Sequence, residues 1–236
     1  MAVILAVDTS AKSVSCALVR DGNVLASYFA NNGLTHSQTL LPMVDHLLQT
    51  AAITMKQVDA LAVNAGPGSF TGVRIGVSAV KGLAFTSGLP CVSVSTLESM
   101  AEMVSLVDGM AVCGVMDARC QQVYTAVFAS DESGNIKRLS EDEAISIVEL
   151  GEKLKALDTP VVLVGDGSSL CYKILRETVP NLVLAPSSVR FQNAVGTALV
   201  AERLYQQGST LSAEELLPTY LRLPQAEREL NSRLSQ

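Results

Sequence analysis

The stretch Val3-Ile4-Leu5-Ala6-Val7-Asp8 decides the fold, because this pattern of an apolar run ending in aspartate occurs twice in the chain. The second copy, Val112-Cys113-Gly114-Val115-Met116-Asp117, places its aspartate 109 positions after the first, from position 8 to position 117. A further apolar run follows each aspartate at the same interval, beginning at Val14 and at Val123. This agreement of order and spacing indicates a duplicated unit.

Each half also carries a loop of small residues after a later apolar run. In the first half, residues 61–63 lead into Gly66-Pro67-Gly68-Ser69. In the second half, residues 161–164 lead into Gly165-Asp166-Gly167-Ser168. Because similar halves often enclose a binding cleft between them, we expect the aspartate loops and the glycine loops to line one.

Helical and strand-like patterns alternate along both halves. In the first half, strands are expected over 2–8, 13–20, 23–30, 58–64 and 91–94, and helices over 39–51, 70–87 and 95 to about 107. In the second half, strands are expected near 111–117, 122–129, 135–139 and 161–165, and helices near 146–156, 168–178 and 190–207. The predicted fold class is α/β, with two similar lobes that each hold a mixed sheet and flanking helices. We place the lobes at residues 1–107 and 108–236, with the C-terminal helix free to pack back on the first lobe.

Composition narrows the functional classes. The 236 residues are 48% apolar and 17% charged, with a net charge of −6 and no tryptophan. No cluster of lysine and arginine is present, so binding to nucleic acid by this chain alone is not expected. The five cysteines are odd in number and form no Cys-x-x-Cys pair, which suits a reducing compartment. With neither a signal peptide nor a membrane span in the pattern, we expect a soluble, cytoplasmic protein.

Metal and nucleophilic chemistry find little support in the sequence. The two histidines, His36 and His46, lie ten residues apart, or roughly 15 Å along a helix, so they cannot share one metal ion. Cysteines do not replace them as a ligand cluster. His36 is the one candidate for a general base, and nothing in the pattern supplies a partner to orient it.

The loop Gly66-Pro67-Gly68-Ser69-Phe70-Thr71-Gly72 follows a predicted strand and opens a predicted helix. Free amides at a helix N-terminus attract anions, so the loop is a candidate phosphate cradle. It lacks the Gly-Lys-Ser/Thr ending of a P-loop. The alternative, which we favour, is a tight turn that feeds a packing helix, with Gly72 and Gly76 allowing another helix to approach closely.

A degenerate nucleotide cleft is the second candidate site. Turns that hold phosphate normally contain glycines, and neither 11–13 nor 119–121 contains one. The candidate cleft residues are Asp8, Thr9, Ser10, Asp117, Gly165, Asp166 and Gly167.

Four segments carry a resemblance to a known family. They are Ile4-Leu5-Ala6-Val7-Asp8-Thr9-Ser10, Gly66 to Gly76, Asp117-Ala118-Arg119 and Pro218-Thr219-Tyr220-Leu221-Arg222. These segments resemble the TsaB family, also called YeaZ, over essentially the whole chain. The resemblance implies the duplicated sugar-kinase/Hsp70/actin-like (ribonuclease H-like) fold. It also implies a role in forming N6-threonylcarbamoyladenosine at position 37 of tRNAs that read codons beginning with adenine.

The same resemblance implies a non-catalytic paralogue of TsaD. The His-x-x-x-His metal motif of TsaD aligns with Thr96-Leu97-Glu98-Ser99-Met100, where Thr96 and Met100 replace both histidines. The implied partners are TsaD, as a heterodimer, and the ATPase TsaE, with a homodimer formed when the chain is alone. Contact with tRNA is implied only within the complex. No resident cofactor is expected, and the alternative is ATP or ADP with Mg²⁺ in the degenerate cleft or at the interface of the complex.

The predicted helices 39–51 and 70–87 are the candidate partner surface. The residues proposed for it are Leu40, Val44, Leu47, Arg74, Val77 and Lys81, and for each the alternative is core packing. Two other functions stay open at this point. One is an ATP-using phosphotransferase or ATPase with Asp8 and Asp117 near magnesium, and the other, least favoured, is a metallopeptidase.

Overall fold

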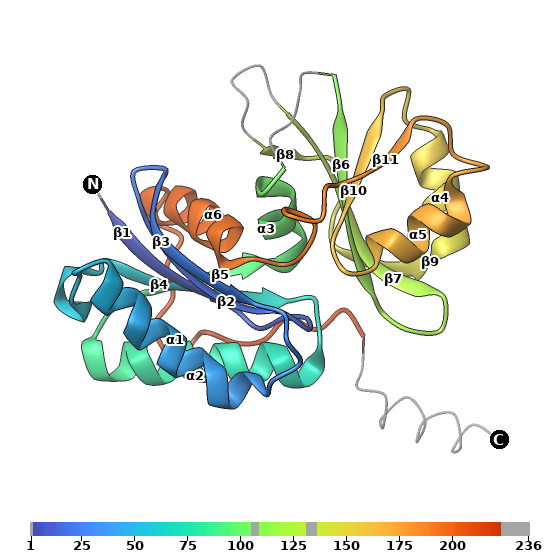
Figure 1. Cartoon of the computed structure of the whole chain (residues 1–236). Coiled ribbons are helices and arrows are strands. Elements are labelled where there is room, and N and C mark those ends of the chain that lie inside the picture. Colours follow the sequence, from blue (N-terminus) through green and yellow to red (C-terminus); the bar gives the residue numbers. More distant parts are fainter. Residues whose placement is uncertain (1, 105–108, 131–135, 223–236) are drawn as a thin grey trace.

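The computed structural model describes residues 2–104, 109–130 and 136–222, arranged as two lobes (Figure 1). The first lobe is built on a five-stranded sheet in the order β3-β2-β1-β4-β5. Its strands are β1 Val3–Asp8, β2 Val14–Arg20, β3 Asn23–Ala30, β4 Ala60–Gly66 and β5 Cys91–Ser95. The second lobe holds a sheet in the order β11-β10-β6-β7-β8, with β9 also paired to β7. Its strands are β6 Ala111–Asp117, β7 Gln122–Ser130, β8 Ile136–Arg138, β9 Glu143–Ser146, β10 Val161–Val164 and β11 Leu182–Leu184.

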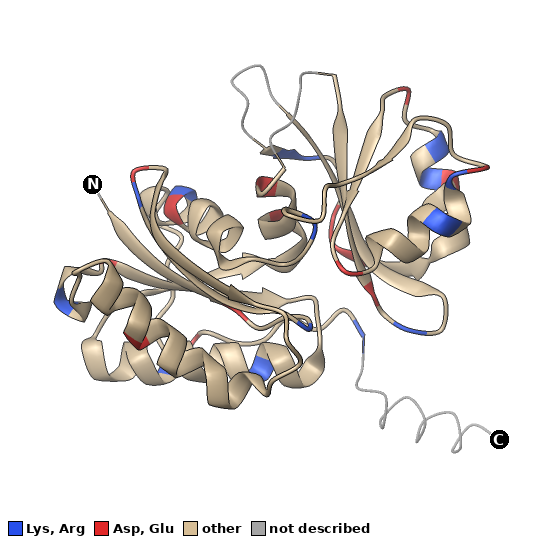
Figure 2. Cartoon of the chain, in the orientation of Figure 1, with Lys and Arg blue, Asp and Glu red and all other residues tan. Residues whose placement is uncertain are grey.

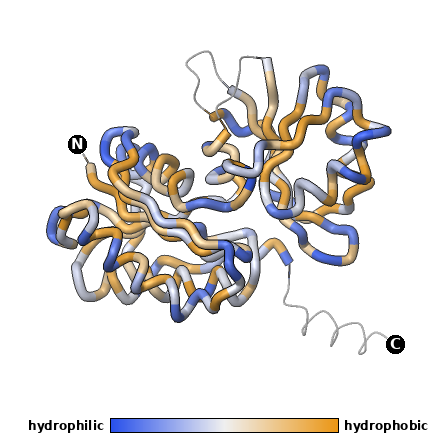
Figure 3. Tube along the Cα trace, viewed as in Figure 1, coloured by the Kyte–Doolittle hydropathy of each residue, from blue (hydrophilic) through white to orange (hydrophobic). Residues whose placement is uncertain are grey.

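The predicted duplication of two mixed sheets is confirmed by strand order and direction. Strand β1 pairs antiparallel with β2 and parallel with β4, and β6 pairs in the same way with β7 and β10. The hydropathy-coloured trace shows the hydrophobic residues concentrated along these strands (Figure 3). Parallel strands buried on both faces read as continuous apolar runs, which is why both copies of the repeat could be recognised from the sequence.

Each sheet carries two helices on one face. In the first lobe these are α1, His36–Thr50, and α2, Phe70–Ser87, which pack on the face formed by Val3, Leu5 and Val7 of β1. In the second lobe, α4 (Ile147–Lys155) and α5 (Ser168–Leu175) pack on the equivalent face of β6. A short 3₁₀ helix, Met55–Gln57, precedes β4.

The opposite faces are covered by helices exchanged between the halves. Helix α3, Thr96–Glu102, comes from the first half and packs on the second-lobe sheet through Leu97, Met100 and Ala101. Helix α6, Ala194–Gln206, comes from the second half and packs on the first-lobe sheet. The carboxylate of Glu202 on α6 accepts the backbone N–H groups of Asp21 and Gly22, at 2.5 and 2.7 Å, which ties α6 to the first-lobe hairpin.

The two exchanged helices cross in close contact between the lobes. A methyl group added to Gly196 on α6 would clash with the backbone carbonyl of Ser99 on α3, so glycine is required for this approach. The hydroxyl groups of Ser99 and Thr197 are hydrogen-bonded at 3.0 Å. The crossing therefore fixes one lobe against the other.

Helix boundaries follow local capping, and here some predictions were wrong. Helix α2 spans the predicted residues, with the Ser69 hydroxyl accepting the Gly72 N–H and Gly88 ending the helix at φ 72°. Helix α1 begins at His36, three residues before the predicted start at position 39, so Thr39 lies inside the helix and its hydroxyl donates to the carbonyl of Thr35. Helix α6 begins four residues later than predicted, because the Asn193 side chain caps it by accepting the Val195 N–H.

Several features of the predicted organisation lie outside the described residues. They are the lobe boundary between 107 and 108, the second hairpin turn at 131–135 and the polar C-terminal end beyond 222. Strands β9 and β11 were not predicted, since each has no more than four residues and lacks a regular apolar pattern. The residues after α6 return to the first lobe, where Leu211 bridges to Cys91 and Leu216 enters the core.

Replacing Gly196 by alanine should destabilise the protein, because the new methyl group forces α6 away from α3. We expect the free energy of unfolding, measured by urea denaturation, to fall by about 1–3 kcal/mol. Gly82→Ala is the matched control, since Gly82 lies in α2 with no atom within 4 Å of the added methyl. The control should gain about 0.5–1 kcal/mol of stability. Equal effects of the two substitutions would contradict the role assigned to the α3–α6 crossing.

Candidate functional site

A cleft with a volume of about 510 Å³ lies between the lobes and is bordered by loops from both. Its walls come from the loop after β1, the glycine loop after β4, the ends of β6 and β10, and a C-terminal segment. The lining includes Ser10, Ala11, Lys12, Pro67, Gly68, Ser69, Asp117, Arg119, Tyr124, Asp166, Tyr220 and Arg222. Of the seven predicted cleft residues, the structure places Ser10, Asp117 and Asp166 in this lining.

Asp8 and Thr9 lie beneath the cleft floor. Asp8 is 1% exposed, and its Oδ1 atom accepts the N–H and hydroxyl of Ser10 at 2.8 and 2.7 Å. Burial raises the pKa of the Asp8 carboxyl, and the bonds from Ser10 oppose that rise. The Thr9 hydroxyl donates to the carbonyl of Gly72 at 2.7 Å. These bonds hold both side chains within the loop, and neither residue is in the cleft lining.

The loop after β6 repeats the same turn with its aspartate facing the cleft. Asp117 Oδ1 accepts the Arg119 N–H at 2.8 Å, as Asp8 Oδ1 accepts the Ser10 N–H. Arg119, Cys120 and Gln121 have φ values of 66°, 54° and 55°, a left-handed conformation that normally favours glycine. Three residues other than glycine thus adopt, with backbone strain, the conformation for which glycine is normally used.

Asp166 is the second acidic residue of the cleft lining, beside Asp117. Its Oδ1 atom accepts a hydrogen bond from the Gln192 amide at 2.9 Å. Burial raises the pKa of Asp166, and the negative charge of Asp117 raises it further. Gly165 and Gly167 do not line the cleft: added methyl groups would clash with Val115 and Asp117, so both glycines allow the loop to pack on the end of β6.

The glycine-rich loop before α2 is a packing element. A methyl group on Gly68 would lie 2.5 Å from the Ser10 carbonyl, and one on Gly72 would clash with the Thr9 carbonyl. The Ser69 N–H, at the start of α2, donates to the Ser10 carbonyl at 2.7 Å. The favoured alternative of a tight turn is therefore supported. The predicted packing partner was wrong. The glycines allow close contact with the loop that follows β1, whereas another helix was predicted.

The C-terminal segment Pro218–Arg222, quoted in the sequence only as a motif, forms part of the cleft wall. The Thr219 N–H donates to the Ala65 carbonyl at 2.7 Å, and Gly66, at φ 132°, lies directly against Thr219. Arg222 Nη1 donates to the Ala118 carbonyl of the second lobe at 3.0 Å. This segment thus spans from one lobe to the other. Its role was missed because it contains no helical or strand-like pattern.

The predicted partner residues divide into two groups. Leu40, Val44, Leu47 and Val77 are between 0% and 3% exposed and pack between the helices and the first-lobe sheet. The apolar stripe of each helix faces its own sheet, and a role of these four residues in a partner surface stays a prediction. They belong to the core, which was the alternative.

Arg74 and Lys81 lie on the outer side of α2 and contact the chain's own C-terminal segment. The Arg74 guanidinium lies 3.9 Å from the centre of the Phe70 ring, and its Nε donates to the Tyr220 hydroxyl at 2.8 Å. Lys81 donates to the carbonyls of Glu214 and Leu216 at 3.2 and 3.1 Å. A role of these two cations in partner binding stays a prediction.

A groove of about 510 Å³ runs between the outer sides of α1 and α2. It is lined by Ser37, Leu40, Leu41, Phe70, Thr71, Arg74, Ile75, Ser78 and Ala79. Leu41 is 49% exposed there, and Figure 2 shows that most of both helices is uncharged. This groove, rather than the buried stripes, is the accessible apolar surface of the two helices.

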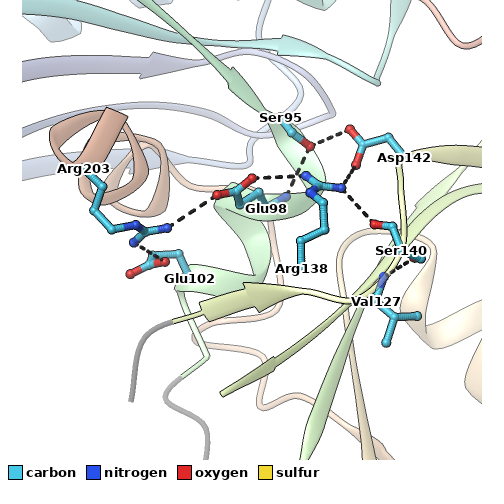
Figure 4. Close-up of polar contacts among 8 residues, drawn as sticks. All are labelled: Ser95, Glu98, Glu102, Val127, Arg138, Ser140, Asp142 and Arg203. Carbon is cyan, nitrogen blue, oxygen red and sulfur yellow. Dashed lines mark hydrogen bonds and ion pairs between the residues drawn. The ribbon is translucent and has the colours of Figure 1, made fainter. Parts of the chain in front are cut away.

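An ion-pair network lies on the other side of the molecule and connects α6, α3 and the second lobe (Figure 4). Arg203 of α6 pairs with Glu102 and Glu98 of α3 at 2.7 and 3.5 Å. Glu98 also pairs with Arg138 of β8 at 3.1 Å, and Arg138 pairs with Asp142 at 2.6 Å. The network strengthens the attachment of the two lobes at the helix crossing.

The positions aligned with the TsaD metal ligands form part of the core. Thr96 and Met100 are both 0% exposed, and Met100 packs against the second-lobe sheet. Within the described part of the chain, no group of three or more histidine, cysteine, aspartate or glutamate side chains is placed to hold a metal ion. Nε2 of His36 lies 2.7 Å from the Ala11 carbonyl. Over the same residues, no helix is long and apolar enough to cross a membrane.

The fold defines the class first. Two lobes with the same mixed sheet, enclosing a cleft, form the actin-like fold that sugar kinases share. A hexokinase of the ROK type from Thermus thermophilus superposes with a TM-score of 0.52 at 11% identity, covering 86% of this chain and 99% of that chain. At this identity the likeness shows the fold alone.

Sequence comparison then gives the family. Residues 32–230 match the family model of TsaD, tRNA N6-adenosine threonylcarbamoyltransferase. The chain is 37% identical to TsaB of Escherichia coli over 93% of this chain and 94% of that protein, and 31% identical to TsaB of Bacillus subtilis over 95% and 96%. YeaZ from Pseudomonas aeruginosa superposes with a TM-score of 0.78 at 28% identity, covering 94% of this chain and all of that one. The chain belongs to the TsaB (YeaZ) family, as its motifs predicted.

Glu98→Gln should weaken the ion-pair network, because the variant loses the charge that both Arg138 and Arg203 contact. We expect the free energy of unfolding to fall by about 1.5–3 kcal/mol in urea denaturation. Glu152→Gln is the matched control, since Glu152 is 67% exposed and pairs with Lys155 on its own helix. The control should change stability by less than about 0.5 kcal/mol. Similar losses in both variants would show that the network adds nothing to an ordinary surface pair.

Asp8→Asn should change the pH dependence of stability. Because the folded state raises the pKa of Asp8, the native protein binds that proton more tightly than the unfolded chain does. Asp8 therefore costs stability progressively as pH rises from its ordinary pKa of 3.8 through the raised value. We expect the stability of Asp8→Asn relative to the native protein to increase over this window in denaturant titrations. The exposed control Asp158→Asn should show no such trend. A relative stability of Asp8→Asn that falls as pH rises would reverse the sign and refute this account.

Proposed function

We propose that this protein is a non-catalytic partner or scaffold subunit that acts with TsaD and TsaE to form N6-threonylcarbamoyladenosine at position 37 of tRNA. Two observations support the proposal. The chain matches a TsaB protein over nearly its whole length, and buried core side chains occupy both histidine positions of the TsaD metal motif. Threonine and methionine at these positions offer none of the imidazole ligands of that motif. On this proposal the chain works in the cytoplasm and meets tRNA only within the complex.

The groove between α1 and α2 is the surface we assign to TsaD. Leu41 and Ile75 offer apolar contact area, and the stacked Phe70 and Tyr220 rings, 4.7 Å apart, lie at one end with Arg74 above them. Aromatic and arginine side chains around an accessible apolar patch are typical of binding hot spots. We therefore test this surface at an exposed groove residue and not at Val77. Val77 is buried, so a charge there would unfold the protein and would not test an interface.

The residues around the cleft do not fit a nucleoside triphosphate. Asp8 is buried, the Ser69 amide is bonded to the Ser10 carbonyl, and the glycines of both loops are packed against backbone. The lining cations Lys12, Arg119 and Arg222 share the cleft with the carboxylates of Asp117 and Asp166, which offset the positive charge that would attract a phosphate group. ATP use by this chain alone, the alternative from the sequence, therefore gains no support from the cleft. A nucleotide at the interface of the complex stays a possibility of the proposal.

Leu41→Asp should abolish function while leaving the fold intact, because a charge in the groove must be desolvated when TsaD binds. The assay depletes the native protein in its own cells, expresses the variant, and measures threonylcarbamoyladenosine in digested tRNA. We expect the modification to be restored by the native chain and to remain at the depleted level with Leu41→Asp. Leu170→Asp is the matched control, since Leu170 is 40% exposed on α5, away from the groove, and should restore it.

Two outcomes would contradict the proposal in different ways. Unchanged modification after depletion would remove the pathway assignment itself. Full rescue by Leu41→Asp would keep the pathway and remove the groove as the TsaD surface. Thermal melting of both variants must match the native protein, so that loss of function is not loss of fold.

A further inference from the structure

Residues 218–222 form a strap that is attached to both lobes. They lie outside any helix or strand and border the interlobe cleft. At one end of the strap, the Thr219 N–H donates to the carbonyl of Ala65 in β4 at 2.7 Å. At the other end, Arg222 Nη1 donates at 3.0 Å to the carbonyl of Ala118, which follows β6. The strap therefore connects the first-lobe sheet to a turn of the second lobe.

The middle of the strap is packed against one end of the α1–α2 groove. The Tyr220 ring stacks on the Phe70 ring with 4.7 Å between their centres, and Phe70 lines both the groove and the cleft. The Arg74 Nε atom donates to the Tyr220 hydroxyl at 2.8 Å. The guanidinium of Arg74 also lies 3.9 Å from the centre of the Phe70 ring. These three side chains therefore join the groove to the strap.

Arg74 can bind a second chain and the strap at the same time. Its side chain is exposed, and among the residues that the structure describes no hydrogen bond to its Nη1 or Nη2 atom is found. Guanidinium N–H groups bind carboxylates strongly. Helix α2 contains no acidic residue, so a carboxylate of a bound chain would meet no like charge on this helix. A chain in the groove can thus bind the Nη atoms while Nε stays bonded to Tyr220.

The far end of the strap contacts a strained turn. Residues 119–121 have φ values between 54° and 66°, and none of them is glycine. A left-handed conformation of this kind persists only when the surrounding contacts hold it. Two of those contacts are the bond from the Ala118 N–H to the Gln122 carbonyl and the bond from Arg222 to the Ala118 carbonyl. Release of Arg222 therefore removes one of the restraints on the turn.

We infer that the strap couples the α1–α2 groove to the turn after β6. A carboxylate that binds Arg74 fixes the guanidinium over Phe70, and the two side chains then hold the strap in its docked state. In that state Arg222 stays on Ala118. Coupling between two binding contacts is reciprocal, so loss of the Arg222 contact weakens binding in the groove. The step from a bound chain to Arg74 rests on the proposed function, whereas the step from Arg74 to the turn does not.

The first test is amide hydrogen exchange of the chain alone, followed by NMR. Arg74→Met removes the bond to Tyr220 and keeps a long apolar side chain. We expect the amides of Thr219 and Ala118 to exchange faster by about 5-fold or more, because both are protected by the docked strap. Arg176→Met, at an exposed position that ends α5, is the matched control and should change neither amide.

The pattern of exchange distinguishes coupling from a local effect. Tyr220→Phe removes only the hydroxyl and should accelerate the same two amides by a smaller factor. Faster exchange at Thr219 without a change at Ala118 would overturn the inference, because the strap would then not act on the turn. Asp117, which belongs to the β6–β7 ladder, should keep its native exchange. Acceleration at Asp117 as well would show general loosening of the second lobe and would also overturn the inference.

The second test is the dissociation constant of the complex with purified TsaD, measured by calorimetry. Arg222→Met should raise it by at least about 5-fold, although Arg222 does not line the groove. Arg222→Lys keeps a donor for the Ala118 carbonyl and should recover part of the affinity. Lys12→Met is the matched control, since Lys12 is another cation of the cleft lining, and it should bind as the native chain does. Native affinity of Arg222→Met would overturn the coupling.

The coupling and the proposed function fail in different ways. Binding of Leu41→Asp to TsaD with native affinity would remove the groove as the TsaD surface, while the exchange of the chain alone would still decide the link from Arg74 to the turn. Unchanged exchange in Arg74→Met would remove that link and leave the groove assignment intact.

Discussion

The crossing of α3 and α6 is the contact on which the rest of the structure depends. Each helix leaves the half of the chain that encodes it and covers the sheet of the other half. Gly196 lets the two backbones meet, and the Arg203–Glu98–Arg138 ion pairs hold the ends of the crossing. Because each lobe lacks a complete cover without the other's helix, the two lobes form one cooperative unit with a cleft between them.

The same close packing occupies the backbone groups of the two glycine loops beside the cleft. In the first lobe the glycine loop packs against the turn after β1, where the Ser69 N–H donates to the Ser10 carbonyl and the Gly72 carbonyl accepts the Thr9 hydroxyl. In the second lobe Gly165 and Gly167 pack on the end of β6. The geometry of an actin-like fold is retained while its binding surface is internal. The proposed partner surface is therefore the groove between the outer sides of α1 and α2.

Sequence reasoning predicted what depends on repetition and burial. The two copies ending in Asp8 and Asp117, the mixed sheet in each lobe, and the bounds of α2 were confirmed. The sequence could not separate a partner surface from the core, because an apolar stripe such as Leu40, Val44 and Leu47 has the same pattern whether it faces a sheet or a partner. The role of the Pro218–Arg222 segment had no periodic signal at all. Its place is set by the backbone N–H of Thr219, which donates to the Ala65 carbonyl as any residue but proline could, and by the Arg222 side chain, which donates to the Ala118 carbonyl.

The most direct test of a scaffold that binds TsaD through α1 and α2 is amide hydrogen exchange of this chain with and without purified TsaD. We predict that exchange slows on the outer sides of α1 and α2 around Leu41 and Ile75, and is unchanged at Asp117 and Asp166. Protection confined to the interlobe cleft, with α1 and α2 unaffected, would contradict this account. That result would indicate that TsaD binds at the cleft.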